Sequence, residues 1–541
     1  MMLRRDYRRS IILGTAAFAA VFLFMALAVA ALFTFDAGGS AAGVMDPYTL
    51  RILRFTLYQA TLSTVFSIVL GLPVALALGR RRAFPGRIWV IRLMAVPMGL
   101  PVIVGAFGII TIWGRQGLLN TVLTSAGLDE PFSIYGLSGI LIAHVFFNLP
   151  LSIRLMLATL ERIPGEYWRM AASLGMGPVS TFRFIEWPAV ARVMPGIAGL
   201  VFMLCATSFT LVLLLGGGPA ATTLEVAIYQ ALRFDFDPQR AIALSVLQIA
   251  LTAILLGLLA LLPSAEAEIP SLGRPLRRFD GRGIGLHLWD GGAITLAVLF
   301  ISLPLIAIAV SGLSSDLPRL LSAPIFRRAA MTSLAIAMLS ATFVIVCCVA
   351  IIGARQAIGS RRRVWRPLRA LSAMLGAGSS LVLLVPPVVL GSGWFLLLRG
   401  IGDATFQAPF LVALINMLMA LPLAMRVLEP AFASHFLRTG RLSASLGLEG
   451  VRRLRIADLP VLWRPLAMAF SFAMALSLGD LGAVALFGSE DFVTLPWLVY
   501  SSMGSYRTND AAGYAFLLGV VCLLLAAGGV SRQSQSARAN I

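Results

Sequence analysis

Lysine is absent from this chain of 541 residues, so all 43 basic side chains are arginines. The absence excludes a phosphate-binding P-loop, because that motif needs a lysine that reaches the β- and γ-phosphates of a nucleotide. The chain is therefore expected to bind no ATP and to need no cofactor of its own. If ATP drives the protein, a separate subunit must bind the nucleotide.

Charged residues of any kind are scarce. They make up 12% of the chain, whereas a soluble domain carries about 25%. Hydrophobic residues make up 59%, and the mean hydropathy is +0.90. A soluble core cannot bury this much apolar surface, so the composition predicts an all-α integral membrane protein.

Cysteine and histidine are few and scattered. The cysteines fall within apolar segments and lack metal-ligand spacing such as C-x2-C. No cluster of histidine, cysteine and carboxylates indicates a catalytic or metal site, so we expect neither an enzyme nor a metal. The residues concerned are Cys205, Cys347, Cys348, Cys522, His144, His287 and His435.

Long apolar runs are abundant instead. A helix needs about 20 mostly apolar residues to cross a bilayer, and twelve segments satisfy this condition. The predicted spans are 11–33, 57–79, 93–113, 137–160, 193–215, 241–262, 291–311, 330–353, 370–398, 409–425, 465–488 and 512–530.

Arginine is distributed unevenly over the loops between these spans. The N-terminus and every second loop hold 32 arginines, the other loops hold 10, and Arg154 lies within a span. Because positive loops face the cytoplasm, both termini are expected there. The net charge of +19 is therefore interpreted as a topology signal and a contact with anionic lipid, not as a nucleic-acid site.

Two cytosolic stretches repeat one pattern: loop A, residues 163–188, and loop B, residues 436–460. Chance matches would scatter in their spacing, whereas these matches share an offset of 272 residues, which indicates an internal duplication. The matching pairs are Gly175 and Gly447, Pro188 and Pro460, Pro150 and Pro422, and Arg154 and Arg426.

The duplication predicts two similar halves, 1–262 and 291–541, joined by a cytoplasmic linker at 263–290. Six spans in each half is an even number, so both halves insert with the same orientation. Their pseudo-two-fold axis should then run along the membrane normal, as in parallel-repeat transporters.

Each loop carries a small apolar face followed by a glycine that ends a short helix. Taken alone, this face suits either docking into a groove of a partner or lying on lipid headgroups. The candidate residues are Met170, Ala171, Ala172, Leu174, Gly175 and Pro188 in loop A, and Leu442, Ser443, Ala444, Leu446, Gly447 and Pro460 in loop B.

Here the loops resemble the EAA motif of permease subunits of bacterial ABC importers. The Glu of the motif's E-A-A triplet is replaced by Met170 in loop A and Leu442 in loop B, so a polar contact of that Glu is not expected. The resemblance implies that each loop is a coupling helix seated in a cytoplasmic ABC ATPase, two copies of which would bind the chain.

The resemblance extends over nearly the whole chain. It implies a type I importer permease fold in a bacterial inner membrane, with a periplasmic substrate-binding protein as the outer partner. The cargo implied is thiamine or its phosphates, because the chain is similar to fused thiamine importer permeases; fused ferric iron permeases are the alternative. The stretches that carry the similarity are 84–87, 114–117, 135–150, 163–166, 182–188, 215–232, 476–488 and 504–507.

Polar and helix-breaking residues inside the spans are candidates for the translocation pathway. Asp480 is costly in a membrane and is a functional candidate by default; Ser208 occupies the duplicate position. A contact between helices or at a gate explains Asp480 equally well. Pro101 and Pro387 interrupt helical hydrogen bonding, either as packing kinks or along the pathway.

Two other classes of function fit the sequence less well. An ion-coupled secondary carrier would need carboxylates near the membrane midplane, and Asp480 is the only acidic residue in the predicted spans. A membrane-embedded enzyme would need clustered nucleophiles or metal ligands. The sequence therefore favours an ATP-driven importer permease.

Overall fold

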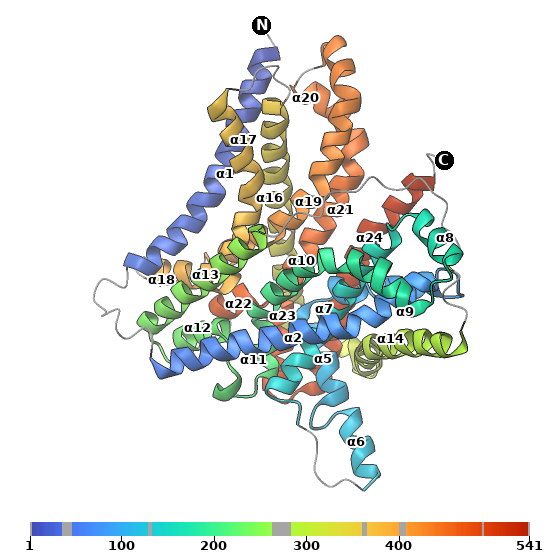
Figure 1. Cartoon of the computed structure of the whole chain (residues 1–541). Helices are drawn as coiled ribbons and strands as arrows, with labels where there is room; N and C mark the ends of the chain where they lie inside the picture. Colours follow the sequence, from blue (N-terminus) through green and yellow to red (C-terminus); the bar gives the residue numbers. More distant parts are fainter. Residues whose placement is uncertain are drawn as a thin grey trace. The chain divides into compact units, whose positions relative to one another are not determined.

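The computed structural model describes residues 3–34, 46–127, 133–261, 278, 283–359, 365–399, 407–448, 450–488 and 492–538. All regular secondary structure in these residues is helical (Figure 1). The prediction of an all-α protein is confirmed.

Long helices dominate the chain. They are α1 (Leu3–Thr34), α2 (Pro47–Arg80), α7 (Leu137–Glu161), α10 (Trp187–Ala206), α13 (Pro238–Leu261), α14 (Ile284–Leu313), α16 (Pro324–Gly359), α17 (Arg366–Leu381), α19 (Ala408–Ser445), α21 (Leu459–Gly479) and α24 (Thr508–Arg538). Shorter helices include α3 (Arg87–Leu93), α5 (Val102–Trp113), α8 (Gly165–Ser173), α11 (Thr210–Leu215), α12 (Leu224–Arg233), α18 (Pro387–Arg399), α22 (Gly482–Phe487) and α23 (Leu495–Gly504).

Eleven segments among the described residues are long and apolar enough to cross a membrane. They correspond to eleven of the twelve predicted spans. The exception is 370–398, which is divided between α17 and α18, with a break at Val385 and Pro386. Proline has no N–H to donate, so consecutive prolines at 386 and 387 prevent one continuous helix here.

Three further predicted spans are not continuous helices. Segment 93–113 is divided among the end of α3, α4 (Val96–Gly99) and α5, with Pro101 at the second break. Segment 193–215 is divided between α10 and α11, with Ser208 at the break. Segment 465–488 is divided between α21 and α22, with Asp480 at the break. The breaks at Ser208 and Asp480 lie 272 residues apart, and non-helical backbone at membrane depth is tolerated only where protein or water satisfies it.

The helices form two compact units. The larger unit contains residues 1–44, 227–249 and 312–541, and the smaller unit contains 45–226 and 250–311. These units cut across the halves expected at 1–262 and 291–541. The reason is that α1 packs along α16 and α18 in the larger unit, whereas Ile308 of α14 lies against Gly108 in the smaller unit.

A hydrogen bond of the same kind, from the start of a helix to a side-chain hydroxyl, occurs in each unit. In the smaller unit the first N–H of α12, at Leu224, donates to Thr56 Oγ1 at 3.1 Å. In the larger unit the first N–H of α23, at Leu495, donates to Ser333 Oγ at 2.8 Å. A hydroxyl on α2 or α16 thus satisfies an N–H that a helix start leaves without an intrahelical partner.

Candidate functional site: the two duplicated loops

Loop A lies in the smaller unit and begins with a helix break. Helix α7 ends at Glu161, Pro164 precedes α8, and α8 runs over Gly165–Ser173. Trp168 and Ala171 on α8 are 4% and 5% exposed. Met170 and Leu174 are 55% and 70% exposed, so α8 presents apolar side chains outward.

Loop B lies in the larger unit and has no such break. Phe436 occupies the position that corresponds to Pro164, and α19 continues through it to Ser445. Leu442 and Leu446 are exposed, whereas Ser443 is buried. This pattern repeats that of Met170, Leu174 and Ala171; the side chain of Ala444 lies outside the described residues.

Both loops end their helix with the same turn. Gly175 has φ +64° and Gly447 has φ +62°. The N–H of the next residue bonds the carbonyl five residues before it, Met176 to Ala171 at 2.9 Å and Leu448 to Ser443 at 3.0 Å. This is the glycine-dependent helix end expected from the sequence, because other residues are strained at positive φ.

A π-helical turn follows at the same place in each loop, over Phe182–Glu186 and over Leu454–Asp458. Pro188 and Pro460 lie just beyond these turns, in α10 and α21. Because proline lacks an N–H, the α-helical bond to the carbonyl four residues earlier is missing, which favours a wider turn. The fixed position of the proline therefore sets the geometry at which the loop enters the next helix.

Each π-helical turn ends in a buried carboxylate. Glu186 pairs with Arg278 of the linker at 2.7 Å, and the two side chains are 1% and 3% exposed. Asp458 pairs with His435 Nε2 at 2.8 Å and with Arg453 Nε at 3.5 Å. A buried carboxylate needs such partners, because an unpaired charge away from water is strongly unfavourable.

The arginines of these ion pairs also stack on aromatic rings of the two loops. The guanidinium carbon of Arg278 lies 4.0 Å from the centroid of the Trp168 ring on α8. The guanidinium carbon of Arg453 lies 4.6 Å from the centroid of the Phe436 ring on α19. Both distances are within the range of favourable cation–π contacts.

Sequence reasoning missed these charged residues. Glu186 and Asp458 share the 272-residue offset of the other matched pairs, so the repeat contained the signal for an acidic group at this position. Their partners carried no such signal. Arg278 lies in the linker and His435 in the second half, so the two are not a matched pair of the repeat.

The pathway candidates lie at helix ends. The carboxylate of Asp480 accepts the N–H groups of Gly482 at 3.1 Å and Ala483 at 3.3 Å, and it thereby caps α22. Ser208 lies in the corresponding break before α11. Pro101 and Pro387 lie at the starts of α5 and α18. Their part in a pathway stays a prediction.

Residues 67–264 match the family model of the binding-protein-dependent transport system inner membrane component. A thiamine transport system permease protein of Brucella suis biovar 1 is 47% identical over 509 residues, which cover 94% of this chain and 92% of that protein. This chain belongs to the binding-protein-dependent transport permeases. The thiamine transport permeases of Escherichia coli K12 and Haemophilus influenzae are 43% and 35% identical, over 89% and 95% of this chain and 88% and 94% of theirs.

The family confirms the resemblance to importer permeases and the expected type I permease fold. It also confirms that the chain is a multi-pass membrane subunit. The two loops are the places where the fold repeats an exposed apolar helix end beside a buried ion pair.

Proposed function

We propose that this permease is the transmembrane subunit of an ATP-driven importer that carries thiamine from a periplasmic binding protein to the cytoplasm. The observation that supports this proposal is the sequence identity of 47%, over 94% of the chain, with a thiamine transport system permease protein. Thiamine phosphates are a further cargo of the same chemistry. Ferric iron stays the alternative, and an ion-coupled carrier is disfavoured by the family.

Two copies of a cytoplasmic ABC ATPase would bind the exposed apolar side chains of the loops. Met170 and Leu174 would contact one copy, and Leu442 and Leu446 the other. Apolar side chains on a helix surface suit a helix-in-groove contact, and Gly175 fixes the helix end beside them in loop A. The ATP would be held by these subunits, because the chain lacks the lysine of a P-loop.

The outer surface would meet the binding protein. With 32 arginines in one set of loops, the positive-inside rule supports cytoplasmic termini in a bacterial inner membrane. The acidic side chains Asp235 and Asp237 are exposed on the opposite set of loops. Asp510 of that set pairs with Arg319, whereas Glu490 and Asp491 lie outside the described residues.

Transport would follow from a change between inward-facing and outward-facing states. Closure of the ATPases on ATP would pull on loops A and B, and their motion would reach α10 and α21 through the π-helical turns. The ligands must bind the two states with different affinity, because equal affinity shifts no equilibrium.

The test is reconstitution of the chain with its ATPase and binding protein in proteoliposomes. ATP-dependent uptake of labelled thiamine is measured beside labelled ferric iron, with a non-hydrolysable ATP analogue as control. Uptake of thiamine alone supports the proposal. Uptake of iron alone, or uptake driven by an ion gradient without ATPase, contradicts it.

A further inference from the structure

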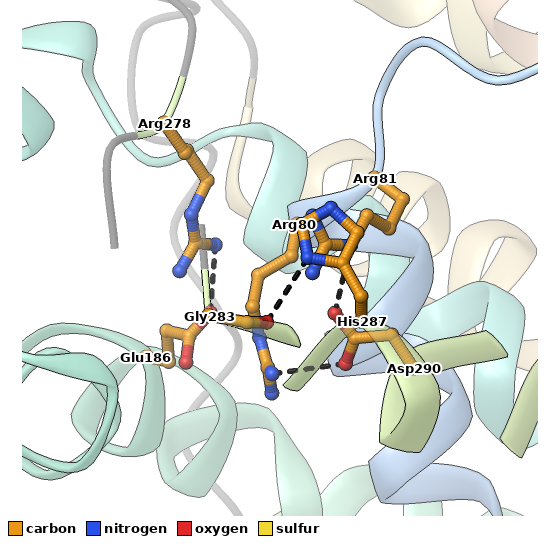
Figure 2. A network of polar contacts seen from close by, with 7 residues as sticks. All are labelled: Arg80, Arg81, Glu186, Arg278, Gly283, His287 and Asp290. Carbon is orange, nitrogen blue, oxygen red and sulfur yellow. Dashed lines mark hydrogen bonds and ion pairs between the residues drawn. The ribbon is translucent and has the colours of Figure 1, made fainter. Parts of the chain in front are cut away.

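The linker contributes a side chain to the interior of loop A. It joins α13, which ends at Leu261, to α14, which begins at Ile284. Arg278 lies between them in sequence, yet its side chain is 3% exposed. Figure 2 shows it pointing at Glu186 from the linker. A passive connector would leave an arginine in solvent, because burial of its charge is unfavourable without a partner.

Arg278 joins the two ends of loop A. Its guanidinium donates to Glu186, at the end of the π-helical turn that leads into α10. The same guanidinium stacks on Trp168, in the middle of α8. One linker residue therefore connects the helix that carries Met170 and Leu174 to the helix that crosses the membrane.

A second attachment holds the C-terminal end of the linker, where α14 begins. Asp290 of α14 is 1% exposed and accepts from Arg80 Nη1 and Arg81 Nε, both at 3.0 Å. Arg81 also donates to His287 Nε2 at 2.7 Å, and His287 Nδ1 lies 3.0 Å from the carbonyl oxygen of Gly283 (Figure 2). Because arginine can only donate, His287 accepts at Nε2 and carries its proton at Nδ1.

The covalent route between α8 and α10 passes through a turn that contains Gly175 and Gly177, and nothing lies within 4 Å of a Cβ placed at either glycine. The turn is held by backbone hydrogen bonds, such as that from the N–H of Met176 to the carbonyl oxygen of Ala171 at 2.9 Å, and Pro164 separates α8 from α7. Arg278 adds a side-chain contact that spans this turn and joins its two ends directly.

We propose that Arg278 is a positioning residue that fixes α8 to α10, so that the linker forms part of the route by which ATPase motion reaches the membrane helices. This inference rests on the proposed function. It gives a role in coupling to the linker, for which the sequence predicted only a connection between two halves. This role belongs to loop A, since the carboxylate of loop B is held by His435 of α19 and by Arg453, and not by the linker.

The test compares Arg278→Ala with Arg277→Ala, which removes the same charge one residue earlier. Both chains are assembled with the ATPase and binding protein in proteoliposomes, and ATP hydrolysed per thiamine imported is measured. We expect the ratio to rise about fivefold or more in Arg278→Ala, the effect of losing a coupling interaction, and to stay unchanged in Arg277→Ala. The double variant Arg278→Glu, Glu186→Arg restores the ion pair and should recover part of the coupling.

A second measurement does not depend on cargo. Hydrogen exchange of residues 165–186 is followed in the purified full-length permease, and we expect it to be about tenfold faster in Arg278→Ala than in Arg277→Ala, as for a segment released to open locally. Equal exchange and equal coupling in the two variants would overturn the inference while leaving thiamine import intact. Faster exchange in Arg278→Ala than in Arg277→Ala, together with a wild-type chain that imports no thiamine, would uphold this inference and overturn the proposed function.

If Arg278→Ala does not assemble, Glu186→Gln and Arg278→Lys replace it. Gln keeps the shape of the carboxylate without its charge, and Lys keeps the charge without the planar stack on Trp168. Raised ATP consumption per thiamine in both supports the positioning role, and an unchanged ratio in both contradicts it.

Discussion

Loop A and loop B reach the same exposed apolar pattern by different constructions. In loop A a short helix, α8, stands apart from α7 and is held by Arg278 from the linker. In loop B the corresponding residues are the end of α19, a helix of 38 residues, and the carboxylate is held by His435 of that same helix. The separate helix α8 is therefore held by a side chain from outside loop A, whereas the continuous helix α19 is held by its own backbone hydrogen bonds.

The cause of the difference is a single pair of residues. Pro164 in loop A corresponds to Phe436 in loop B. Proline at 164 prevents α7 from continuing, while Phe436 both continues α19 and offers its ring to Arg453. The consequence is that the two loops should respond differently when their ion pairs are removed.

The largest contrast is expected for removal of the two carboxylates. Glu186→Ala leaves Arg278 buried and charged, which should cost about 3–5 kcal/mol of stability. Asp458→Ala should cost less, about 1–3 kcal/mol, because Asp458 is held by a histidine and a partly exposed arginine and not by a fully buried arginine. Thermal unfolding of the two purified variants in the same detergent measures the difference; equal losses would remove this distinction between the loops.

A proline placed in loop B should make it resemble loop A. Phe436→Pro interrupts α19 and should destabilise it by about 3 kcal/mol. It also removes the ring beneath Arg453, so the end of α19 should lose protection. Hydrogen exchange of residues 437–448 checks this result, with Phe436→Leu as the control that keeps the helix; slow exchange in the proline variant would show that α19 is not the source of stiffness.

Replacing the glycine should reduce stability by the same amount in the two turns. A Cβ at Gly175 or Gly447 meets no atom within 4 Å, so substitution by Ala tests backbone strain alone. Each variant should lose about 1 kcal/mol, the cost of a positive φ for an L-residue. Thermal unfolding and ATP-dependent uptake are measured for both, and unequal losses would mean that the turns are not equivalent.

The smallest effect on stability is expected at the breaks in the membrane helices. Asp480→Asn keeps an acceptor for the N–H groups of Gly482 and Ala483, because Asn caps helices about as well as Asp. The variant should assemble normally, with a stability change within about 0.5 kcal/mol. Its uptake of thiamine should fall, because thiamine carries a fixed positive charge that a carboxylate attracts and a neutral amide does not.

Ser208→Ala, at the duplicate position, supplies the matched control. Full uptake by Asp480→Asn in membrane vesicles would remove the charge from the mechanism and leave Asp480 as a cap. Reduced uptake by both variants would point to the breaks themselves, not to the carboxylate.

Local sequence pattern predicted the approximate positions of most membrane helices but not of the breaks within them. Eleven of the twelve predicted spans overlap segments of the described residues that are long and apolar enough to cross a membrane. The breaks at Ser208 and Asp480 were missed, because an apolar run shows hydropathy and not the path of its backbone. Pro101 and the prolines at 386 and 387 carried local signals for breaks, and the segments around them were still predicted as single spans.

Residue patterns along the chain were enough to predict the apolar spans, the repeat of loops A and B, the helix ends at Gly175 and Gly447, and the resemblance to a family. The pairing of Arg278 with Glu186, a partner 92 residues away, and the packing of α1 with α16 and α18 became visible only in the folded chain. A turn is set by a few consecutive dihedral angles, which residue types restrict directly. An ion pair between distant segments exists only after packing has removed both charges from water and left each as the other's partner.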